Sequence, residues 1–304
     1  MLAADYPLTV ESPAVTSNGT FAYSVGGFSA AINAVYRYDP VANTWTQMAN
    51  IPTGLSDAGI AYAANTNKIY VFGGFNGSTV FNTTQIYDIA TNTWSMGAAM
   101  PDGRVFPSAA YYSGNSKIYV IGGFYPDGNE ANQTWEYDPV SNTWDTSRAN
   151  IPVAMGGAGY SIAGQFVYLA GHWNNGAAST DHYRYDIVDN TWAAIAPVPV
   201  AIYRPAAAGV GTKEYLVGGG NPFVGVSGKT GRLAPKQAFL KAPAVAYTST
   251  YIYDTVSNTW TTGPSTNVPH SFTGGTAIGN LLLVVGGSNG SDDTNTVEKS
   301  VICP

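Results

Sequence analysis

Hydrophobic and polar positions along the chain follow short patterns that are separated by turns. Residues 58–63 are small and apolar, and residues 68–74 form a continuous β-branched and aromatic run that ends in two glycines. Residues 83–89 alternate between polar and apolar positions, and residues 93–98 contain a tryptophan. Short continuous runs are typical of strands covered on both faces, and alternation is typical of half-buried strands. The pattern therefore predicts four consecutive antiparallel strands.

The same pattern recurs along the chain with two fixed marks. Diglycines begin at positions 26, 73, 122, 218 and 286, and Gly171-His172 occupies the corresponding place between the third and fourth of them. The successive intervals are 47, 49, 49, 47 and 68 residues. A Tyr-Asp pair followed by Asn-Thr-Trp accompanies the first five, and Tyr precedes Trp by seven residues each time. Self-similarity at a fixed period indicates a repeat architecture.

These marks resemble the Kelch repeat, which combines a diglycine with a spaced Tyr and Trp at a period near 50 residues. The resemblance covers nearly the whole chain and is closest to the bacterial secreted or surface type. It implies an all-β fold, a six-bladed Kelch β-propeller with four-stranded antiparallel blades. We accordingly expect residues 1–304 to form one domain.

Two parts of the chain depart from the repeat. The sixth unit lacks an Asn-Thr-Trp strand, and an unassigned strand pattern occupies residues 5–12. We predict that this N-terminal strand completes the last blade as its outermost strand, which would leave no open edge. The 68-residue interval also predicts an insertion in blade five, at about residues 221–247, which contains four of the thirteen Lys and Arg residues. A loop of this length inside a compact domain is either functional or disordered.

Composition excludes several function classes. The net charge is −6 and the pI is about 4.9, so we expect no nucleic-acid partner. No apolar run is long enough to span a bilayer, so we expect no membrane insertion. The single cysteine, Cys303, permits no internal disulfide. Low lysine content and abundant Asn, Thr, Ser, Gly and Tyr favour an extracellular or cell-surface location, with the periplasm as an alternative. We expect the segment to belong to a longer multidomain chain.

Strand direction alternates within a blade, so the connections that vary between repeats emerge on one face and the repetitive turns on the other. Binding residues concentrate on variable loops held by a rigid scaffold. The variable face supplies aromatic, amide and charged groups suited to a sugar or a peptide. The candidate ligand-binding residues are Asp57, Arg104, Phe124, Tyr125, His172, Trp173, Tyr203, Arg204, Phe223 and His270. The alternative is that the aromatic residues only pack on neighbouring loops and that the arginines only bond nearby carbonyls.

The sequence carries few signs of catalysis. The three histidines lie in different units without paired spacing, so no metal site and no cofactor are expected. We expect a non-catalytic recognition module that binds a glycan or protein ligand through the variable face. One alternative is a sugar-modifying enzyme that resembles the sialic-acid mutarotases of this fold group, for which Asp57, Arg104 and Arg204 would supply acid–base and carboxylate-binding groups. Another is a structural subunit of a surface assembly.

Overall fold

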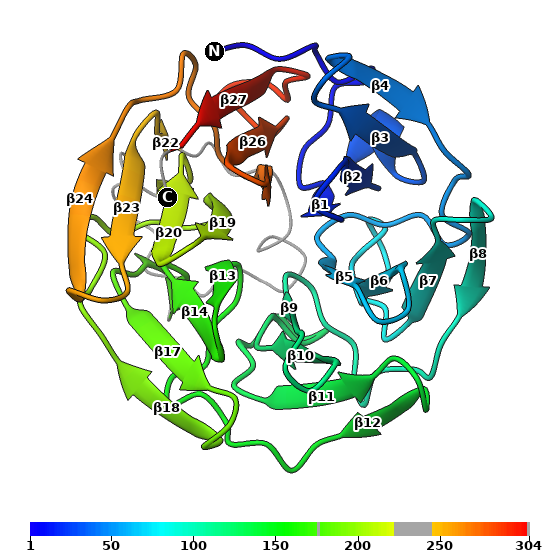
Figure 1. The fold of residues 1–304 in the computed structure, drawn as a ribbon, viewed down its shortest axis with the longest axis vertical. Coiled ribbons are helices and arrows are strands. Elements are labelled where there is room, and N and C mark those ends of the chain that lie inside the picture. The colour runs from blue at the N-terminus through cyan, green and yellow to red at the C-terminus, as the bar shows by residue number, and fades with distance from the viewer. Residues whose placement is uncertain (175–176, 222–244, 303–304) are drawn as a thin grey trace.

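Six antiparallel sheets stand side by side in a ring around a central axis (Figure 1). The computed structural model describes residues 1–174, 177–221 and 245–302. Each sheet is one blade, in which the first strand lies nearest the axis and the following strands lie progressively further out. The prediction of an all-β, six-bladed propeller with four-stranded blades is confirmed.

The strand bounds follow the repeat. Blade one contains β1 (Ala14–Ser17), β2 (Ala22–Val25), β3 (Val35–Asp39) and β4 (Thr44–Gln47). Blade two contains β5 (Gly59–Ala63), β6 (Lys68–Phe72), β7 (Thr84–Asp88) and β8 (Thr93–Met96). Blade three contains β9 (Ser108–Tyr112), β10 (Lys117–Ile121), β11 (Thr134–Asp138) and β12 (Thr143–Asp145). Blade four contains β13 (Gly159–Ala163), β14 (Phe166–Ala170), β17 (His182–Asp186) and β18 (Thr191–Ala194). Blade five contains β19 (Ala206–Val210), β20 (Lys213–Val217), β23 (Thr250–Asp254) and β24 (Thr259–Gly263). Blade six contains β25 (Gly274–Ile278), β26 (Leu281–Val285) and β27 (Val297–Val301).

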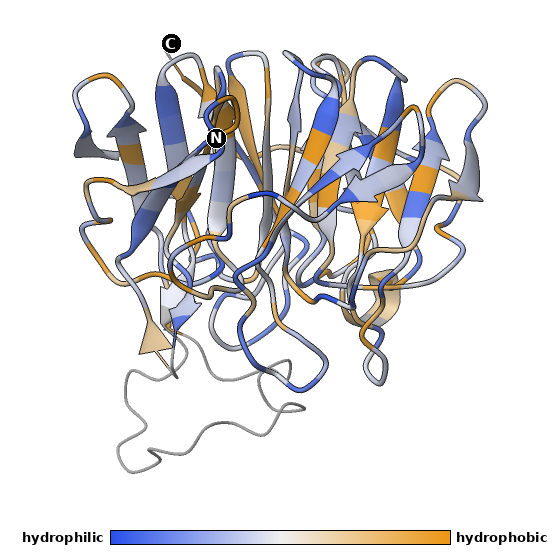
Figure 2. Ribbon diagram, turned by 90° about the horizontal axis from the view of Figure 1, so that it is seen from below, coloured by the Kyte–Doolittle hydropathy of each residue, from blue (hydrophilic) through white to orange (hydrophobic). Residues whose placement is uncertain are grey.

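The short turns within blades lie at one end of the ring, and the longer connections lie at the other (Figure 2). We call these ends the turn face and the loop face. The connections include a 3-10 helix, η1 (Ser29–Ala31), and two small ladders, β15 (Trp173–Asn174) with β16 (Ala177–Ala178) and β21 (Gly220–Asn221) with β22 (Val245–Ala246). The second ladder joins the two ends of the expected insertion, and residues 222–244 between them lie outside the described residues. No helix in the described part of the chain is long and apolar enough to cross a membrane.

The repeated Tyr-Asp and Asn-Thr-Trp residues fasten each blade to the one before it. In blade two, Asn92 Oδ1 accepts hydrogen bonds from the Tyr87 hydroxyl (2.7 Å) and from the Ala49 amide of blade one (2.8 Å). The Trp94 indole donates to the carbonyl of the same alanine at 2.8 Å. Asn92 adopts a positive φ of 54°, a conformation that asparagine tolerates better than most residues. The motif therefore serves the scaffold, as its regularity on the turn face predicts.

The diglycines also join neighbouring blades. Gly26 has a φ of 63°, and a Cβ added there would lie 2.1 Å from the Leu55 carbonyl oxygen. The amide of Gly27 donates to that same oxygen at 2.9 Å. Only glycine allows the end of the second strand to approach the next blade so closely.

The N-terminal segment closes the ring beside β27, as Figure 1 shows. The Ala3 amide donates to the Val297 carbonyl at 2.9 Å, and the Lys299 amide donates to the Met1 carbonyl at 2.9 Å. Ala4 connects blade six to blade one in the same way that Ala49 connects blade one to blade two. Its amide donates to Asn43 Oδ1 (3.0 Å), and its carbonyl accepts a hydrogen bond from the Trp45 indole (3.0 Å). The predicted closure is confirmed, but pairing begins at residue 1 rather than at residue 5. Beyond Tyr6 the chain leaves the outer edge and approaches the axis.

Candidate functional site

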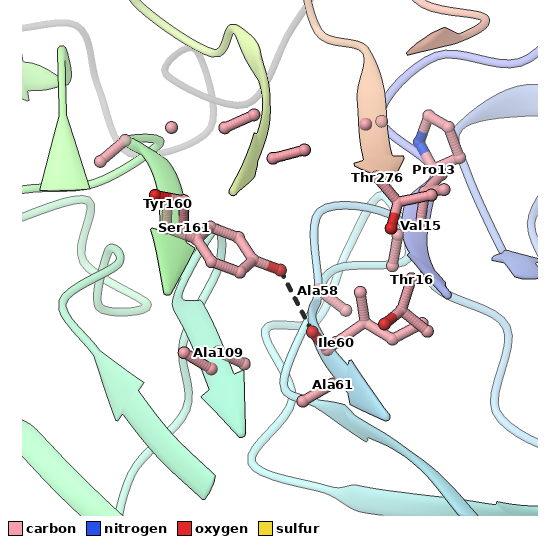
Figure 3. A pocket seen from close by; sticks show the side chains of 18 of the residues that line it. Pro13, Val15, Thr16, Ala58, Ile60, Ala61, Ala109, Tyr160, Ser161 and Thr276 are labelled. Atoms are coloured by element: carbon pink, nitrogen blue, oxygen red, sulfur yellow. Dashed lines mark hydrogen bonds between the residues drawn. The ribbon is translucent and has the colours of Figure 1, made fainter. Parts of the chain in front are cut away.

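A cavity of about 310 Å³ follows the propeller axis. The free edges of the innermost strands form its wall, because each of these strands pairs with a neighbour on one side only. At the turn face the lining includes Ser17, Tyr62 and Tyr111. Figure 3 shows the lining side chains, with Tyr160 reaching from one wall toward Ile60 on another. This volume is at the lower end of the range for small-ligand pockets.

On the loop side the cavity ends at a ring of six residues, each placed just before an innermost strand. We call this the axial ring, and all its members have φ between 52° and 68°: Ser12, Asp57, Phe106, Gly157, Arg204 and Phe272. Five hydrogen bonds run from the amide of a member to the carbonyl of the preceding one, at N···O distances of 2.6–3.4 Å. Positive φ is uncommon for Phe and Arg, so the hydrogen-bonded ring holds them in a conformation of higher energy. Among the described residues, none of those directly preceding a ring member lines the cavity.

Arg204 is caged by aromatic rings at the axis. Its guanidinium carbon lies 3.2 Å from the ring centre of Phe106 and 4.0 Å from that of Phe272. These residues come from blades three, five and six, so their side chains converge at the loop-side end of the cavity. Arg204 is 6% exposed, and its Nε and Nη2 atoms have no hydrogen-bond partner among the described residues. A buried donor without a partner costs about 1–3 kcal/mol.

Asp57 lies in the same axial ring and is 7% exposed. The Ser56 hydroxyl donates to its Oδ2 atom at 2.7 Å, whereas Oδ1 has no hydrogen-bond partner among the described residues. Burial raises the pKa of Asp57, and the positive charge of Arg204 opposes this shift. Two donor nitrogens and one acceptor oxygen are therefore buried at this end of the cavity without a hydrogen-bond partner among the described residues.

Glu11, directly before the axial ring, is a second carboxyl group in an unfavourable environment. Burial, followed by the charge of Asp293, raises its pKa from 4.5 to about 7. Because the folded state holds this proton more tightly than the unfolded state, its contribution to stability is full below pH 4.5 and is lost as the pH rises to 7.

We expect Glu11→Gln to remove this part of the pH dependence, which amounts to at most about 3 kcal/mol. Melting temperatures of the wild type and the variant at pH 5 and pH 8 test this expectation. The wild type should lose more stability than the variant between the two values. An equal loss in both proteins would contradict the assignment.

Apart from Asp57 and Arg204, none of the described candidate residues lines the cavity. Arg104 is 1% exposed and lies between the rings of Tyr125 (3.8 Å) and Trp135 (4.4 Å), away from the axis. Its Nη2 donates to Gln133 Oε1 at 3.0 Å, and the Tyr125 hydroxyl donates to the same oxygen at 2.7 Å. This arrangement corresponds to the alternative in which an arginine bonds only its neighbours.

The remaining candidates pack within the loop connections. Phe124, Trp173 and Tyr203 are buried in one aromatic cluster that also contains Phe272. His172 is fully buried, with its ring nitrogens near the Trp173 carbonyl (2.9 Å) and Asp181 (3.0 Å). His270 is likewise buried, beside the Gly286 carbonyl (2.9 Å) and Glu298 (3.3 Å). Phe223 lies outside the described residues.

The candidate ligand-binding residues chosen from the sequence did not include Phe106 and Phe272, which belong to the axial ring, or Glu11, which directly precedes it. One signal was present, because Ser12, Phe106 and Arg204 are each followed by a proline that lies directly before an innermost strand. Aligning those prolines would have placed the three residues at one level of the ring. The described residues contain no group of three His, Cys, Asp or Glu side chains arranged to hold a metal ion.

Comparisons with known proteins agree with this architecture. The model of the KLHDC2/KLHL20/DRC7 Kelch-repeats domain matches residues 12–219. The solved structure described as "Structure of YjhT" superposes with a TM-score of 0.80 at 19% identity, over 98% of this chain and 96% of that chain. At this identity the likeness shows the fold alone. No curated protein matches the sequence significantly. The family model covers more than half of the chain, and the protein therefore belongs to the Kelch-repeat family.

Proposed function

We propose that this propeller is a recognition module that binds a small acidic sugar at the axial ring. The carboxylate of the ligand would accept hydrogen bonds from Arg204, and a ligand hydroxyl would donate to Asp57. The observation that carries the proposal is the set of unpaired, buried polar atoms at the end of the axial cavity, Nε and Nη2 of Arg204 and Oδ1 of Asp57.

The chemistry of these atoms selects the ligand class. A guanidinium group has only donors, and it matches a carboxylate through two parallel hydrogen bonds. An ionised Asp57 offers only acceptors, so it would take up the proton of a hydroxyl group. A molecule that carries both groups on one small ring satisfies the three atoms together. The amide- and hydroxyl-rich composition supports a role for this module on a secreted or cell-surface protein.

Calorimetric titration with N-acetylneuraminic acid and galacturonic acid tests the proposal, with galactose as the neutral comparison. We expect Arg204→Lys to weaken binding of an acidic sugar by about ten-fold or more, because the forked donor pair is lost. Arg184→Lys is the matched control, since Arg184 also stacks on an aromatic ring (Phe166, 4.4 Å) but does not line the cavity. Equal binding of galactose, or unchanged binding by Arg204→Lys, would contradict the proposal.

A second candidate is a sugar-modifying enzyme that interconverts anomers. The observation that favours it is Asp57, which lines the loop-side end of the cavity and whose pKa is raised by burial, as suits a general acid–base at neutral pH. Anomer exchange measured by NMR in the same samples distinguishes the two candidates. A pure recognition module leaves the exchange rate unchanged, whereas an enzyme accelerates it and loses that acceleration in Asp57→Asn.

A further inference from the structure

Tyr160 occupies a position in the axial cavity that no other blade fills with a large polar side chain. It is the second residue of β13, and its counterparts in the other innermost strands are Val15, Ile60, Ala109, Ala207 and Gly275. All six residues line the cavity. Three residues after the axial ring along each innermost strand, the cavity is therefore lined by one tyrosine and by mostly small side chains.

The Tyr160 side chain crosses part of the cavity. Its hydroxyl donates to the Ile60 carbonyl at 3.1 Å, so it links blade four to blade two past the free edge of blade three (Figure 3). Burial raises the pKa of this hydroxyl to about 12, and the group therefore remains a donor at neutral pH. The carbonyl belongs to β5, whose edge facing the axis pairs with no other strand in the described part of the chain. This hydrogen bond between two rigid strands holds the phenol ring of Tyr160 in place.

We propose that Tyr160 is a size-selecting residue that restricts passage along the axial cavity to the axial ring. We place the entrance at the turn face, because the cavity lining extends to the strand ends there, whereas the hydrogen-bonded axial ring is its limit on the loop side. A ligand that enters from the turn face passes Tyr160 before it reaches Arg204. We place the remaining opening beside Ala207 and Gly275, because Tyr160 extends toward Ile60 and these two blades bring only small side chains to this level. Tyr160 and the axial ring are three residues apart, or about 10 Å along a strand. The chamber between them therefore admits a ligand the size of one sugar ring and excludes longer chains.

The identity of the ligand in this inference rests on the proposed function, whereas the restriction is a property of the cavity and is tested without any sugar. Cys303, the one native cysteine, is first replaced by serine. A reporter cysteine is then introduced at Ala58, which lines the cavity directly after the axial ring, or at Ser17, which lines it at the turn face. Reaction rates with a small and a bulky methanethiosulfonate reagent are measured with Tyr160, Tyr160→Leu and Tyr160→Ala.

At Ala58→Cys we expect the bulky reagent to react at least ten-fold faster when Tyr160 is replaced by alanine, with an intermediate rate for Tyr160→Leu. The small reagent should show little difference. At Ser17→Cys, on the near side of Tyr160, all three proteins should react alike. If the bulky reagent reacts with Ala58→Cys at the same rate in all three proteins, the inference is wrong. Such a result would mean either that the cavity is already wide enough beside Tyr160 or that the reagent enters from the loop face. Because Tyr160→Leu makes a smaller cavity, it gives the result even if Tyr160→Ala does not fold.

A second arm links the restriction to the ligand. If the wild type binds an acidic sugar, Tyr160→Ala should gain binding of a disaccharide that carries the same sugar, whereas the wild type should not bind it. Failure of every sugar to bind, together with a rate increase at Ala58→Cys, would contradict the proposed function and leave the restriction standing. Disaccharide binding by the wild type would contradict the restriction.

Discussion

Replacement of Tyr6 by alanine is expected to lower the free energy of unfolding by about 3–5 kcal/mol, the usual cost of removing a buried aromatic side chain. Tyr6 is 1% exposed and packs edge-on against Tyr36 (5.2 Å between ring centres) and Trp45 (4.9 Å) of blade one. Its amide also donates to the Asn295 carbonyl of blade six at 2.8 Å. The residue thus holds both sides of the junction where the ring closes.

Urea unfolding of Tyr6→Ala measures this contribution, with Leu2→Ala as the control. Leu2 belongs to the same segment but is 59% exposed, so its replacement should change stability by less than about 0.5 kcal/mol. Tyr6→Phe keeps the ring and should remain close to the wild type. A cost below about 1 kcal/mol for Tyr6→Ala would mean that the N-terminal segment does not close the propeller.

Replacement of His182 by threonine is expected to cost a similar amount, about 3–5 kcal/mol, because it leaves the buried Glu214 carboxyl group without the polar side chain that faces it. His182 Nε2 faces Glu214 Oε2 at 3.0 Å across the interface of blades four and five, and both side chains are almost completely buried. Neither Glu214 oxygen has a hydrogen-bond partner among the described residues. Other blades have different residues at the corresponding strand positions. Thr84 and Thr134 occupy the position of His182, and Ile69 and Ile118 occupy the position of Glu214.

The double variant His182→Thr with Glu214→Ile makes this prediction specific. It gives the interface the residue pair of the regular blades, and we expect most or all of the lost stability to return, because a neutral pair of threonine and isoleucine avoids the burial of the Glu214 carboxyl group. Thermal and urea unfolding of the two single variants and the double variant form a complete cycle. Additive losses in the double variant would show that the two side chains act independently.

Most of the fold could be predicted from the sequence because its determinants are local and repeated. The Tyr, Asn and Trp of each unit make one set of hydrogen bonds, and each diglycine makes one close contact, so their spacing fixes the blade and its neighbour. The closing strand was predictable from the missing motif in unit six. Its bounds were not, since Ala4 is recognisable only by the bonds that it makes with Asn43 and Trp45.

The site was less accessible to sequence reasoning. Arg104 and Arg204 look equivalent along the chain, because each follows a proline-led segment and lies near an aromatic residue. In the structure only Arg204 is a member of the axial ring, whereas Arg104 lies between Tyr125 and Trp135. A shift of two residues along the chain decides whether a side chain belongs to the axial ring or to the loop behind it, as Phe106 and Arg104 show. The period of the repeat alone does not resolve such a shift. Tyr160 was missed because one tyrosine in a strand is typical of packing.

The most direct test of the account is a crystal structure of the wild-type protein grown with an acidic sugar at saturating concentration. We predict density for one sugar ring between Tyr160 and the axial ring, with its carboxylate within hydrogen-bonding distance of Arg204 Nε and Nη2 and a hydroxyl at Asp57 Oδ1. A cavity filled by ordered water alone, or a sugar bound on the aromatic cluster of the loop face, would contradict the account.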